Sequence, residues 1–395
     1  MGDVQFWMVV GGGSKGGILV RESRDLSSPA LTMRLVTGAV VRQEALDGDR
    51  LLYCKVEGQG PDRGWVTTTL KGKDLLIKKC PVDPSSNGEI AEAYTRKVRK
   101  LSNGILMPIL GLGTGGDPGL KGEECRGVVR KALQFGYRCI DTADMYQNHK
   151  EIQIALRESG VPSNEVFIIT KLSPFFQGEQ QARASVKRIL SDFGIEKLDL
   201  VLIHWPGAWI PEQQQWSLRE WMQQGAAWSK ERRLGTWRAL EQLHEEGLVR
   251  SIGVSNFTVK HLMELEGSAS ILPHVLQAEF HPYYSNAEVR HWCAERGVVF
   301  SSYAPLGGYL TEQNAGHRAI DDPVIQKVAS EIGCTEAQVA LLWSIARDSC
   351  PVPKTCNIER LAENLEVLRF DDKLSEEQLA AIDALDRCKP LYWDP

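Results

Sequence analysis

A regular alternation that begins near residue 97 constrains the fold of this chain more than any other feature. Near-continuous apolar segments alternate eight times with longer amphipathic ones. The apolar segments are 109–114, 138–141, 166–171, 198–205, 251–256, 275–280, 298–303 and 350–354, and the amphipathic ones are 125–136, 149–160, 181–194, 234–247, 258–267, 286–297, 322–333 and 359–368. Strands that are apolar throughout indicate a parallel sheet covered on both faces. Eight units favour closure into a (β/α)8 TIM barrel, and an open doubly wound sheet is the alternative.

Length and composition exclude several classes of protein. The 395 residues allow one large barrel and a small module, and the net charge of -5 gives no basic field that would attract nucleic acid. No apolar run approaches the roughly 20 residues that span a bilayer, and the first 20 residues do not resemble a secretory signal. The nine cysteines form no C-x-x-C pair, which is typical of reduced thiols. We therefore expect a cytoplasmic protein that binds neither nucleic acid nor membranes.

The first 80 residues have a different pattern. Six short strand-like segments, at 4–10, 16–20, 33–41, 50–56, 64–70 and 74–80, are separated by turns that contain Gly, Asp and Ser. This pattern predicts a small all-β barrel, and the stretch 31–67 resembles SH3-like modules. Residues 81–96 are polar and read as a linker, which leaves 97–395 for the barrel. Such a module could dock a protein partner.

The segment GGGSKGG, residues 11–17, matches the G-x-G-x-x-G pattern of dinucleotide sites. That pattern has meaning only where a helix follows at once, because the pyrophosphate binds helix N-terminal amides. Here Leu19 and Val20 lead back into an apolar stretch instead. We interpret the segment as a glycine-rich hairpin loop and expect any nucleotide to bind elsewhere.

Polar residues gather at the C-terminal ends of the predicted strands, where barrels of this type form their active sites. They are Asp141, Lys171, His204, Ser255, Asn256, Gln277, Tyr303 and Lys354, with Tyr146 following Asp141 by five positions. Each has an ordinary structural interpretation when taken alone. Their occurrence together at one rim indicates a site.

The motifs that carry these residues resemble the aldo-keto reductase family, over about residues 97–390. They are GLGT (111–114), DTADMY (141–146), ITK (169–171), IHWP (203–206), GVSNF (253–257), QAEFHPYY (277–284), YAPLG (303–307) and VPKTCNIERLAENL (352–365). The resemblance implies a monomeric barrel that reduces aldehydes or ketones, as small-molecule carbonyl substrates, to alcohols with NADPH, forming NADP+, and uses no metal. The first 95 residues are not explained by it.

The resemblance places a catalytic tetrad on Asp141, Tyr146, Lys171 and His204. Hydride addition leaves negative charge on the carbonyl oxygen, so a proton donor must meet it. A phenol has an ordinary pKa near 10, and a lysine cation about 4 Å away favours its ionised form by roughly 4 kcal/mol. Tyr146 is thus expected as the acid, with Lys171 lowering its pKa and Asp141 holding Lys171. We expect His204 to orient the substrate carbonyl by donating a hydrogen bond.

For the cofactor, the resemblance places Ser255, Asn256 and Gln277 on the nicotinamide carboxamide and Tyr303 under its ring. The sequence after Lys354 allows Asn357 to cap a helix beside Arg360, which forms an anion site suited to the 2′-phosphate of NADP. The full expected set of cofactor contacts is Gly113, Thr114, Gly115, Asp141, Ser255, Asn256, Gln277, Tyr303, Leu306, Lys354, Thr355, Arg360, Glu363 and Asn364.

The substrate pocket is expected to include Tyr146, His204 and Trp205. Two features depart from the family pattern: Gly115 replaces a residue that is often a bulky tryptophan, and the tail after residue 387 is short. An insertion between 206 and 234 carries Trp209, Trp216, Trp221 and Trp228, which could cover the pocket or pack on the barrel. A non-catalytic NADPH-binding subunit on the same fold, as potassium-channel β-subunits partly are, is the alternative function.

Overall fold

The computed structural model describes residues 6–12, 15–70, 73–79, 97–116, 119–207, 230–308, 318–370, 374–388 and 390–392. The chain divides into two compact units, Met1–Ser86 and Asn87–Pro395. The predicted boundaries at 80 and 96 stay a prediction. Each unit is described by itself.

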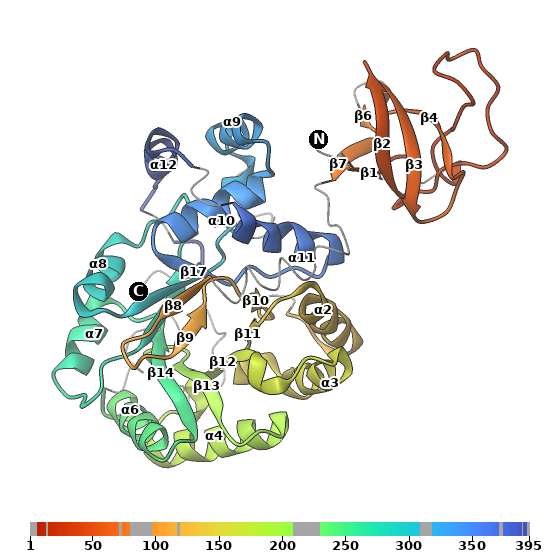
Figure 1. Ribbon diagram of the computed structural model, residues 1–395. Helices are drawn as coiled ribbons and strands as arrows, with labels where there is room; N and C mark the ends of the chain where they lie inside the picture. The colour runs from red at the N-terminus through yellow and green to blue at the C-terminus, as the bar shows by residue number, and fades with distance from the viewer. Residues whose placement is uncertain are drawn as a thin grey trace, which may run out of the picture. The chain divides into compact units, whose positions relative to one another are not determined.

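The second unit is built on eight parallel strands whose order in the sheet is their order in the chain (Figure 1). They are β10 (Leu112–Gly113), β11 (Cys139–Asp141), β12 (Phe167–Leu172), β13 (Leu198–Ile203), β14 (Val249–Ser255), β15 (Val275–Glu279), β16 (Val299–Tyr303) and β17 (Ser349–Pro351). The first and last strands meet, because Gly111 N donates to Pro351 O and Gly113 N donates to Pro353 O, each at 3.0 Å. The closed barrel is confirmed, and the doubly wound alternative is excluded.

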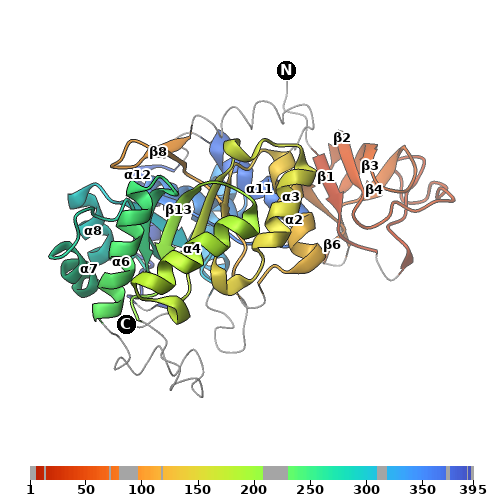
Figure 2. The same ribbon diagram turned by 90° about the horizontal axis from the view of Figure 1, so that it is seen from below.

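Helices surround this barrel, as two views at right angles show (Figures 1 and 2). They are α2 (Gly122–Phe135), α3 (His149–Ser159), α4 (Glu179–Phe193), α6 (Lys230–Glu245), α7 (Val259–Glu266), α8 (Ala287–Arg296), α9 (Pro323–Ile332), α10 (Glu336–Ala346), α11 (Ile358–Leu365) and α12 (Glu376–Asp383). The amphipathic segments predict eight of them. Helices α10 and α12 are additions: α10 is apolar over most of its length, so it lacks the helical periodicity that reveals the others.

An antiparallel hairpin, β8 (Val98–Lys100) and β9 (Leu106–Pro108), precedes the barrel. Asn103 in its turn donates to Arg250 O at the start of β14, 2.9 Å away. Arg99 pairs with Asp348, just before β17, at 2.7 Å. The hairpin therefore lies at the N-terminal ends of the strands, so it leaves the C-terminal ends, where the predicted site residues lie, uncovered.

The first unit contains a five-stranded antiparallel sheet with its own core. The sheet order is β4-β3-β2-β1-β7, and the strands are β1 (Phe6–Val9), β2 (Val40–Asp47), β3 (Arg50–Glu57), β4 (Arg63–Thr67) and β7 (Leu76–Lys79), with β5 (Thr69–Leu70) and β6 (Lys73–Asp74) forming a separate pair. Buried Trp7, Leu35 and Tyr53 belong to its core. The predicted all-β module is confirmed as an antiparallel half-barrel.

Two details of that module differ from the sequence prediction. The predicted strand at 16–20 is wrong, because there only Ile18 forms a ladder contact, an isolated bridge to Leu35. Strand β2 begins at Val40 rather than at the predicted residue 33, and it continues to Asp47, beyond the predicted end at residue 41. Most side chains of its second half are exposed. That part of the strand therefore lacks the apolar signal on which the prediction depended.

The glycine-rich segment is a loop, as expected. Gly17 has φ +117°, and a Cβ placed on it would lie 2.4 Å from Leu35 O. Its N–H donates to Gly12 O at 2.9 Å. No helix follows in the described residues of this unit. Gly12 and Gly17 therefore serve a tight backbone turn, and the described residues of the loop lead into no helix that could bind a pyrophosphate.

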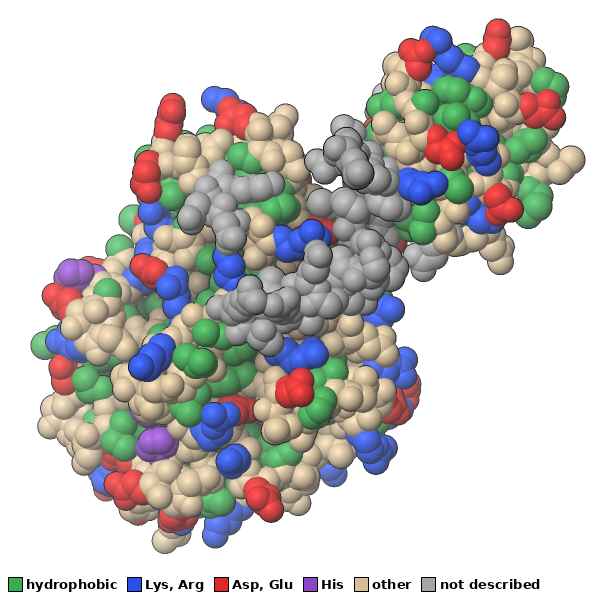
Figure 3. All heavy atoms as spheres, in the orientation of Figure 1, with side chains coloured by type: hydrophobic (Ala, Val, Ile, Leu, Met, Phe, Trp, Pro, Cys, Tyr) green, Lys and Arg blue, Asp and Glu red, His purple; other side chains and the backbone are tan. Residues whose placement is uncertain are grey.

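The described part of the chain has further features that bear on its chemistry. No helix in it is both long enough and apolar enough to span a bilayer. Its eight cysteines are free thiols, and within it no group of His, Cys, Asp and Glu could hold a metal ion. On the barrel face in Figure 3, basic and acidic side chains are interspersed. The cytoplasmic location stays a prediction.

Candidate active site

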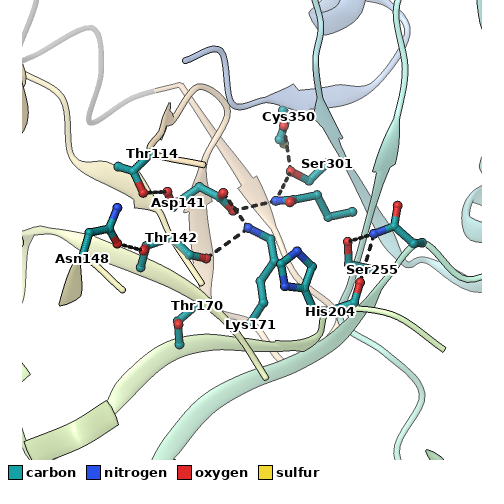
Figure 4. Close-up of polar contacts among 12 residues, drawn as sticks. Thr114, Asp141, Thr142, Asn148, Thr170, Lys171, His204, Ser255, Ser301 and Cys350 are labelled. Atoms are coloured by element: carbon teal, nitrogen blue, oxygen red, sulfur yellow. Dashed lines mark hydrogen bonds and ion pairs between the residues drawn. The ribbon is translucent and has the colours of Figure 1, made fainter. Parts of the chain in front are cut away.

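The centre of the candidate site is a buried ion pair. Asp141 is the last residue of β11, and Lys171 lies near the end of the adjacent strand β12, at the same rim. Lys171 Nζ donates to Asp141 Oδ1 at 2.6 Å and to Thr142 O at 3.1 Å (Figure 4). Burial opposes the ammonium charge, but the attraction of Asp141 and Tyr146 outweighs it and raises the pKa of Lys171. The pair therefore holds a fixed cation in the barrel mouth.

Tyr146 is presented to this cation by a short 3-10 turn, Asp144–Tyr146. Lys171 Nζ lies 5.2 Å from the centre of the Tyr146 ring. The turn is held at both ends, because Thr142 Oγ1 donates to Asn148 Oδ1 at 2.6 Å. Thr142 and Asn148 are both fully buried. They are supports that sequence reasoning missed. Asn148 occupies the N-cap position of α3, but its side chain makes no cap hydrogen bond, so a cap signal would have predicted a different role.

Gly115 lies directly beside Tyr146. A Cβ on this glycine would lie 2.3 Å from Tyr146 Cζ and 2.6 Å from its Oη. Any side chain at position 115 would therefore occupy the space of the phenol. The glycine that departs from the family pattern is thus matched to the position of Tyr146 in this chain.

His204 follows β13 (Leu198–Ile203) and is buried. Its ring lies 5.6 Å from the Tyr146 ring in an edge arrangement and stacks on the Trp205 ring at 6.0 Å. Burial lowers the pKa of His204 well below its ordinary value, and the nearby Lys171 lowers it further. Its Nδ1 is buried and has no hydrogen-bond partner among the described residues. His204 is therefore a neutral imidazole beside the phenol.

Gln277 on β15 connects the Asp141–Lys171 ion pair to Ser301 on β16. Its Nε2 donates to Asp141 Oδ2 at 2.8 Å, so the two carboxylate oxygens bind Lys171 and Gln277 separately. Ser301 Oγ lies 3.4 Å from the same nitrogen and donates to Cys350 O at 2.9 Å. Asp141 is thus held from two sides within the barrel.

Asn256 and Tyr303 lie at the ends of the neighbouring strands. Asn256 has φ +62°, and its Nδ2 donates to His204 O at 3.0 Å and to Ser255 Oγ at 3.2 Å. Tyr303 donates its hydroxyl to Asn256 Oδ1 at 2.8 Å. Burial, followed by the nearby Glu279 carboxylate, raises the pKa of Tyr303 well above its ordinary value. The structure thus brings Ser255, Asn256 and Tyr303 together.

The second predicted region lies after β17. Asn357 caps α11, since its Oδ1 accepts from the N–H groups of Glu359, at 2.8 Å, and Arg360, at 3.2 Å. The Arg360 side chain is exposed, Lys354 is half-buried and Thr355 is buried. The cap thus already uses two helix amides, and the phosphate contacts predicted for Lys354 and Arg360 stay a prediction.

The remaining predicted cofactor residues lie at strand ends and in the segments that follow them. Thr114 donates its hydroxyl to Asp141 O at 2.9 Å, and a Cβ on Gly113 would lie 2.6 Å from Val352 O. Leu306 is half-buried and Asn364 is buried. Glu363 accepts from Thr335 Oγ1 at 2.6 Å, and burial raises the pKa of its carboxyl. The adenine role predicted for Glu363 and Asn364 stays a prediction.

The four tryptophans of the insertion lie outside the described residues. Trp205 is buried, and its backbone oxygen accepts from Gln177 Nε2 at 2.6 Å. The structure therefore groups the four predicted tetrad residues with Gln277, Asn256 and Tyr303 at one rim. Such a site can hold a cation beside a phenol and offer amide groups beside an aromatic ring.

Comparison with known proteins identifies the family. Residues 109–387 match the model of the aldo/keto reductase family. The chain belongs to this family. It is 36% identical over 295 residues to 9,11-endoperoxide prostaglandin H2 reductase of Trypanosoma cruzi, covering 75% of this chain and 93% of the relative. It is also 36% identical over 289 residues to glyoxal reductase of Bacillus subtilis, and this match covers 73% of this chain and 92% of that relative.

Solved structures agree with this assignment. An aldo-keto reductase from Bombyx mori in complex with NADP is 28% identical to this chain, with a TM-score of 0.66. The match covers 74% of this chain and 94% of the silkworm protein. The barrel is thus that of an aldo-keto reductase, and the chain is an oxidoreductase by family.

Proposed function

We propose that this aldo-keto reductase converts aldehydes or ketones to alcohols with NADPH, with Tyr146 as the general acid. The observation that carries the proposal is the buried Asp141–Lys171 pair, whose Nζ lies 2.6 Å from the carboxylate and 5.2 Å from the Tyr146 ring. A buried ion pair is costly unless its geometry is good, and it contributes little net stability. A catalytic role accounts for a cation held beside a phenol.

The residues of the site fit the charge changes of carbonyl reduction. NADPH, when bound, supplies the hydride that adds to the carbonyl carbon. Tyr146 gives its phenolic proton to the carbonyl oxygen, and Lys171 stabilises the phenolate that remains. Asp141 keeps Lys171 charged and in place. His204, which is neutral, donates a hydrogen bond that orients the carbonyl oxygen.

The donor set also fits the cofactor. Ser255, Asn256 and Gln277 place amide and hydroxyl groups next to Tyr303, a combination that suits a carboxamide on an aromatic ring. Their amide nitrogens bond to Ser255 Oγ and Asp141 in this structure and would exchange those partners for the carboxamide. Lys354 and Arg360 supply positive charge for the 2′-phosphate of NADPH. The silkworm relative crystallised with NADP supports this assignment.

For the substrate, we propose small aldehydes, including dicarbonyl compounds. A glyoxal reductase is among the relatives at 36% identity. The Tyr146 phenol fills the space beside Gly115, so the missing side chain does not enlarge the substrate pocket there.

A direct assay tests the proposal. Purified protein is mixed with NADPH and either 4-nitrobenzaldehyde or glyoxal, and the loss of NADPH absorbance is followed. We expect saturable turnover with NADPH and much slower turnover with NADH. Tight NADPH binding with no turnover across a broad carbonyl panel would instead support a non-catalytic NADPH-binding subunit.

A further inference from the structure

Glu279 is a buried carboxylate that the proposed mechanism does not use. It ends β15, two residues after Gln277, and only 2% of its surface is exposed. Its Oε1 accepts from the backbone N–H of Leu391 at 2.6 Å, and its Oε2 accepts from that of Tyr392 at 3.0 Å. One side chain thus binds two consecutive amides more than a hundred residues further along the chain.

His281 completes the surroundings of this carboxylate. Its Nε2 lies 2.9 Å from Glu279 Oε1, and its Nδ1 accepts from the backbone N–H of Tyr283 at 3.3 Å. An imidazole that accepts at Nδ1 carries its proton on Nε2, so His281 donates to Glu279. Three N–H groups therefore surround the carboxylate, and this arrangement suits an ionised group removed from water.

The segment that Glu279 holds contacts Tyr303. The Tyr392 ring lies 6.2 Å from the Tyr303 ring, with the two planes at 70°. The Tyr303 hydroxyl donates to Asn256. The Tyr392 contact therefore fixes the ring of Tyr303, whereas the Asn256 contact fixes its outer end.

Packing within the barrel does not hold Tyr303 on all sides. A cavity of about 450 Å³ is lined by Tyr303, Asn256 and Glu279, and also by Asp386 and Cys388 from the C-terminal segment. A ring that borders a cavity lacks neighbouring atoms on that side. The position of Tyr303 hence depends on the contact that Tyr392 makes.

The part of the segment before Leu391 has contacts of its own. Asp386 accepts a hydrogen bond from Ser285 Oγ. The Arg387 guanidinium lies over the Tyr283 ring, 3.5 Å from its centre. Loss of the Glu279 contacts would thus remove the backbone bonds of Leu391 and Tyr392 to this carboxylate and leave the contacts of Asp386 and Arg387 in place.

We propose that Glu279 is a positioning residue: it fixes the C-terminal segment through the amides of Leu391 and Tyr392, and Tyr392 in turn keeps the Tyr303 ring in place for cofactor stacking. The last step rests on the proposed function, in which Tyr303 lies under the nicotinamide. The hydrogen bonds by which Glu279 fixes the C-terminal segment do not depend on that function.

Three variants test the proposal in the full-length protein. Glu279→Gln replaces an oxygen acceptor with an NH2 group, Tyr392→Ala removes the ring contact, and Tyr392→Phe keeps that contact. Ser285→Ala is the matched control, because it removes another contact of the same segment. Hydrogen exchange at the Leu391 and Tyr392 amides and NADPH affinity by fluorescence titration are measured for each.

We expect Glu279→Gln to speed exchange of both amides at least about tenfold, the effect of one lost hydrogen bond to a charged group. NADPH affinity should fall about 2- to 12-fold in Glu279→Gln and in Tyr392→Ala, the range for one aromatic contact. A double variant with Glu279→Gln and Tyr392→Ala should bind NADPH no more weakly than the weaker of the two single variants, because both changes remove the same support of Tyr303. Tyr392→Phe and Ser285→Ala should bind NADPH as the wild type does.

If hydrogen exchange at the Leu391 and Tyr392 amides is unchanged in Glu279→Gln, the claim that Glu279 fixes the C-terminal segment is wrong. Faster exchange with NADPH affinity at the wild-type value, or additive losses in the double variant, would overturn the effect on Tyr303. If Glu279→Gln fails to fold, Leu391→Pro removes one of the two donors from the segment and takes its place. A wild type that does not bind NADPH would refute the proposed function and the effect on Tyr303, while exchange would still decide whether Glu279 holds the segment.

Discussion

Gly115 and the phenol of Tyr146 share one space, since a Cβ at position 115 would lie 2.6 Å from Tyr146 Oη. The absence of a side chain at one strand end therefore determines where the proposed acid of the next strand end can lie. This relation ties two residues that lie 31 positions apart in the sequence.

The first prediction concerns this pair. Gly115→Ala should displace the Tyr146 ring and lower the rate of hydride transfer, by up to about a hundredfold if the hydroxyl moves by about 1 Å. NADPH affinity should change much less. Single-turnover kinetics and fluorescence titration measure the two effects. Gly127→Ala on α2 is the control, because nothing lies within 4 Å of its Cβ. Equal rates in both variants would contradict the prediction.

The second prediction concerns Lys171. Lys171→Met should abolish turnover and lower the free energy of unfolding by about 3–5 kcal/mol, because Asp141 remains buried without its cation. Adding Asp141→Asn to this variant should restore most of the stability and none of the activity. Urea unfolding and the aldehyde assay measure the two quantities. Recovery of activity in the double variant would show that the ion pair is only structural.

The third prediction concerns cofactor choice. Arg360→Ala should weaken NADPH binding by about ten- to a hundredfold, the effect of one lost charge-assisted hydrogen bond. NADH lacks the 2′-phosphate, so its affinity should hardly change. Fluorescence titration with both cofactors measures the difference. Equal losses would place the phosphate site elsewhere.

The fourth prediction concerns stability in acid. Burial lowers the pKa of His149 and of His274 to about 4 each. Since the unfolded state binds protons near pH 6.5 and the folded state only near pH 4, stability should be lost as pH falls through this window, by up to about 3 kcal/mol for each residue. Urea midpoints between pH 7.5 and 4.5 measure this loss. A double His149→Gln and His274→Gln variant should show a smaller decline, and an identical decline would contradict the assignment.

The fold and the grouping of the site residues could be predicted from the sequence largely because the apolar strands are easy to recognise and the polar site residues lie close to their C-terminal ends. Apolar strands such as Phe167–Leu172 are buried along their whole length, so their pattern is strong. Asp141, Lys171 and Gln277 lie at or within two residues of the C-terminal ends of such strands. A barrel brings these ends together whatever the intervening loops do. The grouping of the site residues could therefore be predicted before any distance was known.

Other features depend on contacts that no local pattern encodes. The hold of Glu279 on Leu391 and Tyr392 joins residues more than a hundred positions apart, and neither partner shows a periodic signal. Thr142 and Asn148 support the Tyr146 turn through one hydrogen bond between side chains. Such pairs become visible only when the chain is folded.

The central claim is that Tyr146 is the general acid, and Tyr146→Phe tests it most directly. The change removes one hydroxyl and keeps the ring, so NADPH binding by fluorescence titration should stay close to that of the wild type. Single-turnover reduction of 4-nitrobenzaldehyde should fall by at least about 10²–10⁴-fold, the usual contribution of a general acid. A Tyr146→Phe protein that still reduces the aldehyde at a near wild-type rate would contradict the account.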